Sequence, residues 1–138
     1  MDLDTGMSPL MFAVSTSNVG AAQMLVQAGA DIFHVDYQGV TPLMLACSIG
    51  DWDCAHLLLR AGANVDAVDL NGWTPLHFAA FGGNPDCCEL LIEEGADRKI
   101  KNNQGRKALH IARSKGFGDV IAVLEDKKSS LYAEEYEA

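Results

Sequence analysis

The chain has 138 residues, a formal net charge of −9 and four cysteines. This length suits a single domain that buries roughly two thirds of the surface of the unfolded chain, so a core can form without disulfides or metal. The acidic excess argues against nucleic-acid binding, because phosphate contacts need a surplus of Lys and Arg. No apolar run approaches the ~20 residues of a membrane-spanning helix, and the start MDLDTG does not resemble a secretory signal. We therefore expect a soluble protein of the cytoplasm or nucleus without membrane insertion.

A unit of 33 residues recurs four times along the chain. Four glycines share this spacing, namely Gly6, Gly39, Gly72 and Gly105. The tripeptides Ser8–Leu10, Thr41–Leu43, Thr74–Leu76 and Lys107–Leu109 keep the same step. Such a period indicates a repeat architecture rather than one irregular domain.

Each unit predicts two helices. Ser or Thr followed by Pro favours a helix start, because the hydroxyl caps free N–H groups and proline suits the first helical position. This first helix ends at Gly50, Gly83 and Gly116, where a residue without a Cβ tolerates a left-handed turn. A second helix follows through DCAHLLLRA, DCCELLIEE and DVIAVLED, with apolar residues three and four apart. A polar extended segment then leads to the next unit.

One helix pair cannot bury its own apolar face, so the copies must stack side by side. The segment GWTPLHFAAFGG…ELLIEEGAD resembles the ankyrin repeat, and the resemblance extends over residues 3–128. It implies an all-α ankyrin-repeat solenoid of stacked antiparallel helix pairs with β-hairpin-like finger loops. We expect one domain over residues 1–138, with repeats at 3–35, 36–68, 69–101 and 102–128. Residues 129–138 either extend the last helix, with Tyr132 and Tyr136 on one face, or form a free acidic tail.

The first and last copies depart from the pattern. The first has Ser17 and Asn18 in place of the helix-ending glycine, and its Met11, Phe12, Val14, Ala21 and Ala22 suggest no polar end surface. We expect either further repeats upstream in the natural protein or a frayed first repeat. The fourth copy has Lys107 and Ala108 in place of Thr-Pro and lacks the closing Gly-Ala-Asp, as expected of a C-terminal cap.

The candidate chemical residues favour structural roles. The resemblance implies that His77, and His110 one period later, tie a helix start to neighbouring backbone, whereas His34 and His56 are expected to be solvated. Cys54 and Cys87, one period apart, are expected to be buried and unpaired, because neighbouring helices lie ~8–10 Å apart. We expect no catalytic residue, metal site or cofactor, since no nucleophile, base and carboxylate share a recognisable frame.

The resemblance also implies a concave groove, lined by residues that flank the finger glycine and by those near the end of each first helix. The predicted partner-binding residues on these columns are Tyr37, Val40, Ile49, Leu70, Trp73, Phe81, Lys101, Arg106 and Lys115. Aromatic residues are favoured anchors of binding energy, although Trp73 and Phe81 could instead fill space by packing on each other. Trp52 lies outside these columns and is expected to pack between repeats.

The sequence therefore predicts a non-catalytic module that binds a protein or peptide. The basic end of the groove predicts a partner with apolar anchors and an acidic end over the fourth repeat. The module would act as an adaptor, scaffold or inhibitor and be monomeric by itself. The alternative is a regulatory or targeting domain excised from a larger enzyme or channel.

Overall fold

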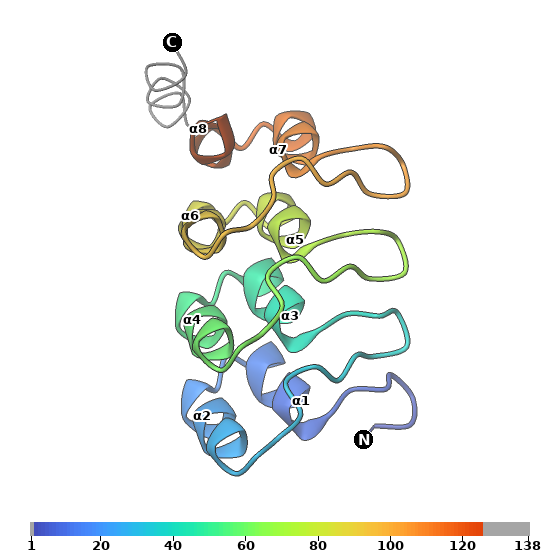
Figure 1. Ribbon diagram of the computed structural model, residues 1–138, viewed down its shortest axis with the longest axis vertical. Helices are drawn as coiled ribbons and strands as arrows, with labels where there is room; N and C mark the ends of the chain where they lie inside the picture. The colour runs from blue at the N-terminus through green and yellow to red at the C-terminus, as the bar shows by residue number, and fades with distance from the viewer. Residues whose placement is uncertain (1, 126–138) are drawn as a thin grey trace.

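The computed structural model describes residues 2–125, which form eight helices and no strand. In chain order these are α1 (Pro9–Ser15), α2 (Val19–Gln27), α3 (Pro42–Ile49), α4 (Trp52–Arg60), α5 (Pro75–Phe81), α6 (Pro85–Glu93), α7 (Ala108–Lys115) and α8 (Gly118–Glu125). Successive helices pair antiparallel, and the pairs stack into an elongated solenoid (Figure 1). The predicted all-α solenoid is thus confirmed. The exact repeat boundaries stay a prediction, and the predicted tail at 129–138 lies outside the described residues.

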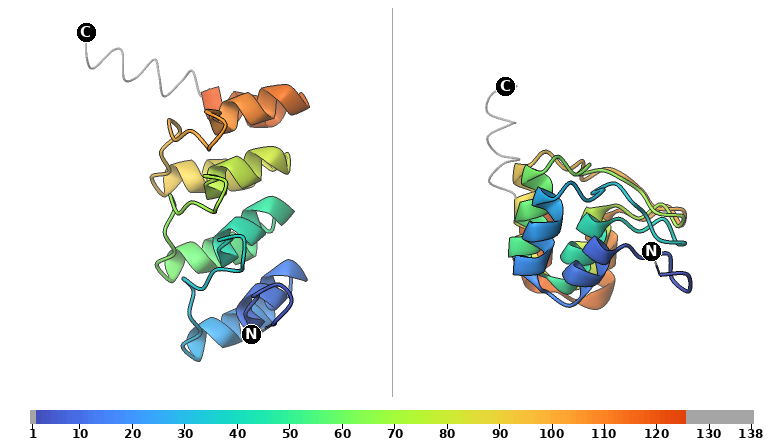
Figure 2. Two further views of the ribbon diagram at one scale, coloured as in Figure 1. Left: turned by 90° about the vertical axis from the view of Figure 1, so that its right-hand side faces the viewer. Right: turned by 90° about the horizontal axis from the view of Figure 1, so that it is seen from below.

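The helices lie in two rows. The odd-numbered helices form an inner row, in which each packs on the inner helices before and after it, and the even-numbered helices form an outer row (Figure 1). Long loops project from the inner row on one side of the stack (Figure 2). We name these loops finger one (residues 2–7), finger two (36–40), finger three (69–73) and finger four (102–106).

The inner helices begin and end as their sequences predict. The hydroxyls of Thr41 and Thr74 accept hydrogen bonds from the backbone three residues on, and a proline follows each of them. Gly50 ends α3 with a left-handed φ of 85°. At the same column Ser17 has φ 56°, so the first copy makes the same turn without glycine. The left-handed turn after the inner helix is therefore kept in the first copy, although serine replaces glycine there.

Apolar columns at the 33-residue spacing fill the space between the two rows. The core includes the buried residues Leu10, Leu43, Leu76, Leu58, Leu91 and Leu124, and the inner-row alanines Ala13, Ala46, Ala79 and Ala112. Met11, Val14 and Ala22 belong to the same core and are fully buried. The second helix pair packs against the first, whereas Phe12 keeps 46% of its surface exposed. The expectation of further repeats upstream or of a frayed first repeat stays a prediction.

The fingers are hairpin-like loops joined to one another by backbone hydrogen bonds. In finger three the Asp69 N–H donates to the Trp73 carbonyl at 3.0 Å, and in finger four the Asn102 N–H donates to the Arg106 carbonyl at 2.8 Å. Leu70 N–H donates to the finger-two carbonyl of Gln38, and Asn103 N–H donates to that of Asn71, both at 3.0 Å. The fingers are thus held in register with one another.

Asn84 joins two neighbouring helix pairs. It precedes α6, but its side chain makes no cap there. Its Nδ2 instead donates to the carbonyls of Cys47 (2.8 Å) and Ser48 (3.1 Å) at the end of α3. These carbonyls lie in the last turn of the helix and have no partner farther along it. The contact brings Gly82, at the end of α5, against the end of α3.

Substituting Gly82→Ala should therefore destabilise the stack. A Cβ on this residue would lie 2.5 Å from the Ser48 carbonyl oxygen and from Asn84 Nδ2. We expect the free energy of unfolding in urea to fall by about 1–3 kcal/mol, since the neighbouring backbone must shift. The control is Gly118→Ala at the start of α8, where an added Cβ meets nothing within 4 Å among residues 2–125 beyond its own helix and chain neighbours. Equal losses in the two variants would contradict the close approach of α5 and α3.

Candidate functional site

A pocket lies where α5, finger four and α7 meet. Its volume is about 230 Å³. The lining residues are Trp73, Phe81, Asn102, Gln104, Arg106, Ile111, Ser114 and Lys115. We call this the aromatic pocket. It joins the third and fourth helix pairs on the finger side of the inner row.

Aromatic contacts fix the rings at this pocket. The Trp73 ring meets Phe81 edge-on with centroids 5.5 Å apart, and it also contacts Phe78 (5.3 Å) and His77 (5.9 Å). The Lys115 Nζ lies 4.5 Å from the centroid of Phe81. Trp73 and Phe81 therefore do pack on each other, yet Phe81 keeps 47% of its surface exposed. Packing orients the rings without removing them from the surface.

The structure brings four of the nine predicted site residues around one pocket: Trp73, Phe81, Arg106 and Lys115. The other five, Tyr37, Val40, Ile49, Leu70 and Lys101, do not line it. Tyr37 lies against Gly6 of finger one, and its hydroxyl donates to the Leu3 carbonyl at 3.0 Å. Leu70, near the tip of finger three, is 67% exposed. The predicted groove residues are thus distributed along the stack rather than gathered at one point.

Four basic residues of the last third of the chain make two kinds of contact. Arg98 donates to the Leu124 carbonyl at 3.1 Å, and Arg113 donates to the Glu125 carboxylate, so both hold the end of α8. Arg106 and Lys115 instead line the aromatic pocket. Only part of the positive charge in this third of the chain therefore lines the pocket.

His77, which contacts Trp73, connects α5 to finger four through its ring nitrogens. It is fully buried, and its Nδ1 accepts the Thr74 N–H at 3.1 Å. Its Nε2 lies 2.9 Å from the Arg106 carbonyl. Because Nδ1 accepts a backbone proton, Nε2 must carry the ring proton and donate it to that carbonyl. The neutral ring thus ties α5 to finger four, which is the role the resemblance implies.

The other three histidines differ from His77 in their contacts and exposure. His110, at the same column, accepts the Lys107 N–H on Nδ1 but is exposed. His34 was expected to be solvated, and this was wrong, because its Nε2 lies 2.7 Å from the Gly6 carbonyl in finger one. The contact crosses 28 residues of sequence, so no local pattern indicates it. His56 stacks on Trp52 with ring centroids 4.7 Å apart.

Sequence reasoning missed Asn102 as a pocket residue. Its column holds Asp36 and Asp69 in the preceding fingers, so a change from carboxylate to amide at the 33-residue spacing was visible. Ile111 and Phe78 were also missed, because their apolar character suits the core equally well. Only the fold shows that Ile111 lines the pocket and that Phe78 contacts Trp73.

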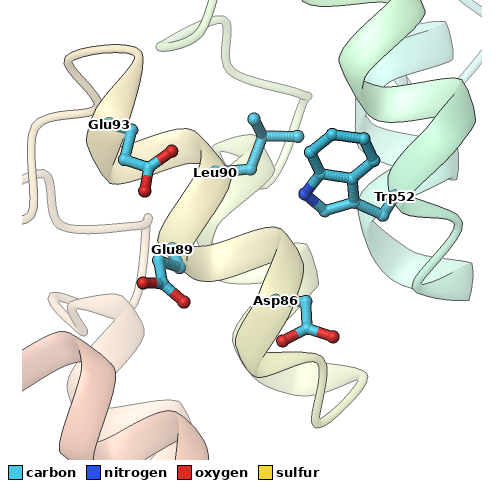
Figure 3. A pocket seen from close by; sticks show the side chains of 5 residues that line it. All are labelled: Trp52, Asp86, Glu89, Leu90 and Glu93. Atoms are coloured by element: carbon cyan, nitrogen blue, oxygen red, sulfur yellow. The ribbon is translucent and has the colours of Figure 1, made fainter.

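A second pocket lies on the outer row, between α4 and α6. It has a volume of about 460 Å³ and is lined by Trp52, Asp86, Glu89, Leu90 and Glu93. Figure 3 shows the Trp52 ring and Leu90 directed toward one another across this gap. Trp52 was expected to pack between repeats. It does face the next pair, but 42% of its surface remains exposed.

The four cysteines are buried and unpaired, as predicted for Cys54 and Cys87. Burial in apolar surroundings raises the pKa of Cys54 and of Cys88 to about 12 and that of Cys87 to about 11. Thiols with such pKa values are protonated at neutral pH and are poor nucleophiles. Within residues 2–125 no three His, Cys, Asp or Glu side chains gather as metal ligands do. None of the described helices has the length and apolar character to cross a membrane.

Stacked helix pairs with hairpin-like loops in register define a solenoid repeat protein. The family model for ankyrin repeats, which spans three copies, matches residues 1–69 and 43–134, and the chain belongs to the ankyrin-repeat family. Ankyrin repeats are protein–protein interaction modules and are typically non-catalytic. A search of curated protein sequences returned no match.

The role of His77 predicts a pH-dependent stability. Burial lowers the pKa of His77 below its usual value near 6.5, although the Arg106 carbonyl and Asp69 oppose the shift. The unfolded chain therefore takes up a proton more readily than the folded chain, so this contribution is complete above pH 6.5 and is lost as the pH falls through and below that value.

We expect His77→Met, the residue type of Met11 and Met44 at this column, to lower the free energy of unfolding by about 1–2 kcal/mol at pH 7.5. The deficit should shrink at pH 5.5, because methionine does not titrate. Urea unfolding at the two pH values measures it, with His110→Met as a control expected to cost less at pH 7.5. A deficit that grows toward acid pH would contradict the assignment.

Proposed function

We propose that this chain binds a partner protein or peptide in the concave groove between the inner helices and the fingers. Through this contact it acts as an adaptor or scaffold, or as an inhibitor of the partner. The observation that carries the proposal is Phe81, which is half exposed, held edge-on by Trp73 and flanked by Arg106 and Lys115. Folding by itself gives no reason to expose this ring.

The aromatic pair has the properties of a binding anchor. Buried aromatic and arginine side chains contribute most of the energy at protein interfaces. The Trp73 ring is already fixed by three neighbours, so little rotamer freedom is lost when a partner binds. These contacts favour protein binding at the aromatic pocket over a purely space-filling role for the rings.

The remaining predicted residues extend the proposed surface along the stack. Tyr37, Ile49 and Leu70 are exposed and would provide further apolar contacts, together with the less exposed Val40. Lys101 is exposed before finger four and adds to the positive charge at that end. The partner would lie with apolar anchors between Tyr37 and Phe81 and an acidic end over finger four. The unpaired cysteines suit a reducing compartment, the cytoplasm or nucleus.

Removing the anchor should abolish partner capture. A photo-crosslinking amino acid at Ser114, which lines the pocket, would be used in lysate with the otherwise native chain and with Phe81→Ala. We expect the native chain to capture a defined partner and Phe81→Ala to weaken its binding by about 30-fold, as for an interface hot spot. The matched control is Trp52→Ala, an exposed aromatic on the outer row. Capture that survives Phe81→Ala, with folding verified by circular dichroism, would place the interface elsewhere.

The predicted direction of the partner has its own test. Arg106→Glu reverses the charge of an exposed residue at the pocket while its backbone carbonyl still accepts the His77 bond. We expect slower association with the captured partner and a weaker dependence of the rate on salt. Binding kinetics at two salt concentrations measure both quantities. Unchanged association would show that the partner's acidic end lies away from finger four.

A further inference from the structure

Asn102 occupies a position that the two preceding fingers give to aspartate. In each of these three fingers the side-chain Oδ1 accepts two backbone N–H groups of the same loop. For Asn102 these come from Gln104 at 2.9 Å and Arg106 at 3.0 Å. Asp36 and Asp69 use one carboxylate oxygen in the same way. The fold thus requires an acceptor here, which either residue type supplies.

The second atom of the side chain differs in chemistry. Asp36 and Asp69 carry another carboxylate oxygen, whereas Asn102 carries Nδ2, a hydrogen-bond donor. Asn102 is only 5% exposed, and its Nδ2 is buried and has no hydrogen-bond partner among residues 2–125. Rotating the amide by 180° would not help, because Oδ1 would then leave the two N–H groups that it accepts. Buried donors are nearly always satisfied, so this one calls for an acceptor.

Asn102 lines the aromatic pocket beside Arg106 and Lys115. We propose that the pocket recognises a carboxylate of the bound peptide, with Asn102 Nδ2 as the neutral donor and the two cations at the rim. This inference rests on the proposed function and specifies its chemistry at one position. Since Nδ2 is buried in the free chain, this proposal requires the exposed side chains of Gln104 and Arg106 to move when a ligand oxygen approaches.

A carboxylate fits this set of groups better than a neutral acceptor. It accepts from the amide while its charge is balanced by Arg106 and Lys115, and charge-assisted hydrogen bonds are the stronger kind. An aspartate in place of Asn102 would direct its own carboxylate oxygen at the ligand and repel it. Asp69 and Asp36 therefore cannot provide the same recognition in fingers three and two.

The test is a titration of the ¹⁵N-labelled full chain followed by NMR. The probes are three peptides: acetyl-Leu-Glu-Leu-amide, acetyl-Leu-Gln-Leu-amide, and acetyl-Leu-Gln-Leu with a free C-terminal carboxylate. The Asn102 side-chain NH₂ signal, assigned by its absence from Asn102→Asp, reports on the proposed donor directly. We expect the glutamate peptide to shift this signal and to bind about ten-fold more tightly than the neutral glutamine peptide.

Asn102→Asp is the decisive variant, because Asp36 and Asp69 show that aspartate supports this loop. It should weaken binding of the glutamate peptide by at least about ten-fold while signals outside finger four stay unchanged. Binding only of the peptide with the free C-terminus would assign the site to a terminal carboxylate. Equal affinity for all three peptides, an NH₂ signal that none of them shifts, or full affinity in Asn102→Asp would overturn the proposal.

The outcomes separate this inference from the proposed function. If the captured partner still depends on Phe81 but binds Asn102→Asp as tightly as the native chain, the groove is the interface and carboxylate recognition is wrong. If the peptides behave as expected but the captured partner ignores Phe81→Ala, the pocket binds carboxylates and the partner docks elsewhere.

Discussion

Each helix pair in this chain has apolar side chains on the two sides that face its neighbours, and it cannot cover them by itself. Leu43 of α3 and Leu58 of α4 are fully buried in a core that is continuous from one pair to the next. The contacts that stabilise the fold are therefore contacts between neighbouring copies, repeated at one spacing. This constraint explains why the 33-residue period extends to small residues such as Ala46 and Ala79, where the inner helices approach closely.

The same stacking also satisfies the backbone of the fingers. The loops close on themselves and donate to the loop before them, as Leu70 does to Gln38, while His77 ties α5 to finger four. Backbone groups that would otherwise compete for water or a partner are thus occupied within the stack. The finger and inner-helix side chains remain available on a scaffold whose shape is already set, which lowers the ordering cost of binding.

The sequence predicts most of the fold because its signals are local. Thr74 before Pro75 starts a helix and Gly50 ends one, each through its own backbone chemistry, so a regular spacing of such residues determines the elements. The contact from His34 to Gly6 and the bond from Arg98 to the Leu124 carbonyl depend on what lies opposite after stacking. Neither residue matches a local pattern, and the expectation of a solvated His34 failed for this reason.

The candidate site shows the same division. The columns beside the finger glycine and at the end of the first helix predicted Trp73, Phe81, Arg106 and Lys115, and these four residues do surround one pocket. The columns could not tell that Tyr37 would lie against finger one, since that depends on the space above Gly6. They also do not reveal whether a polar residue within a finger is satisfied. That Asn102 Nδ2 lacks an acceptor among the described residues is seen only when the donors and acceptors are placed in three dimensions.

A residue can differ from the others at its column for two physical reasons: it lacks a covering helix pair, or it has another role. Its exposure distinguishes the two. Arg113 stands at the column of the buried Ala80, and His110 at that of the buried His77, yet both are exposed, as expected where no further helix pair covers the column within residues 2–125. Asn102 departs from Asp36 and Asp69 but remains buried, so the loss of a neighbour does not account for its amide. Its acceptor oxygen preserves the loop, and its donor adds nothing to the stack. An exchange of aspartate for asparagine keeps the acceptor oxygen that the loop needs and replaces the second oxygen by a donor. Such a change is the kind that ligand recognition, rather than folding, would select.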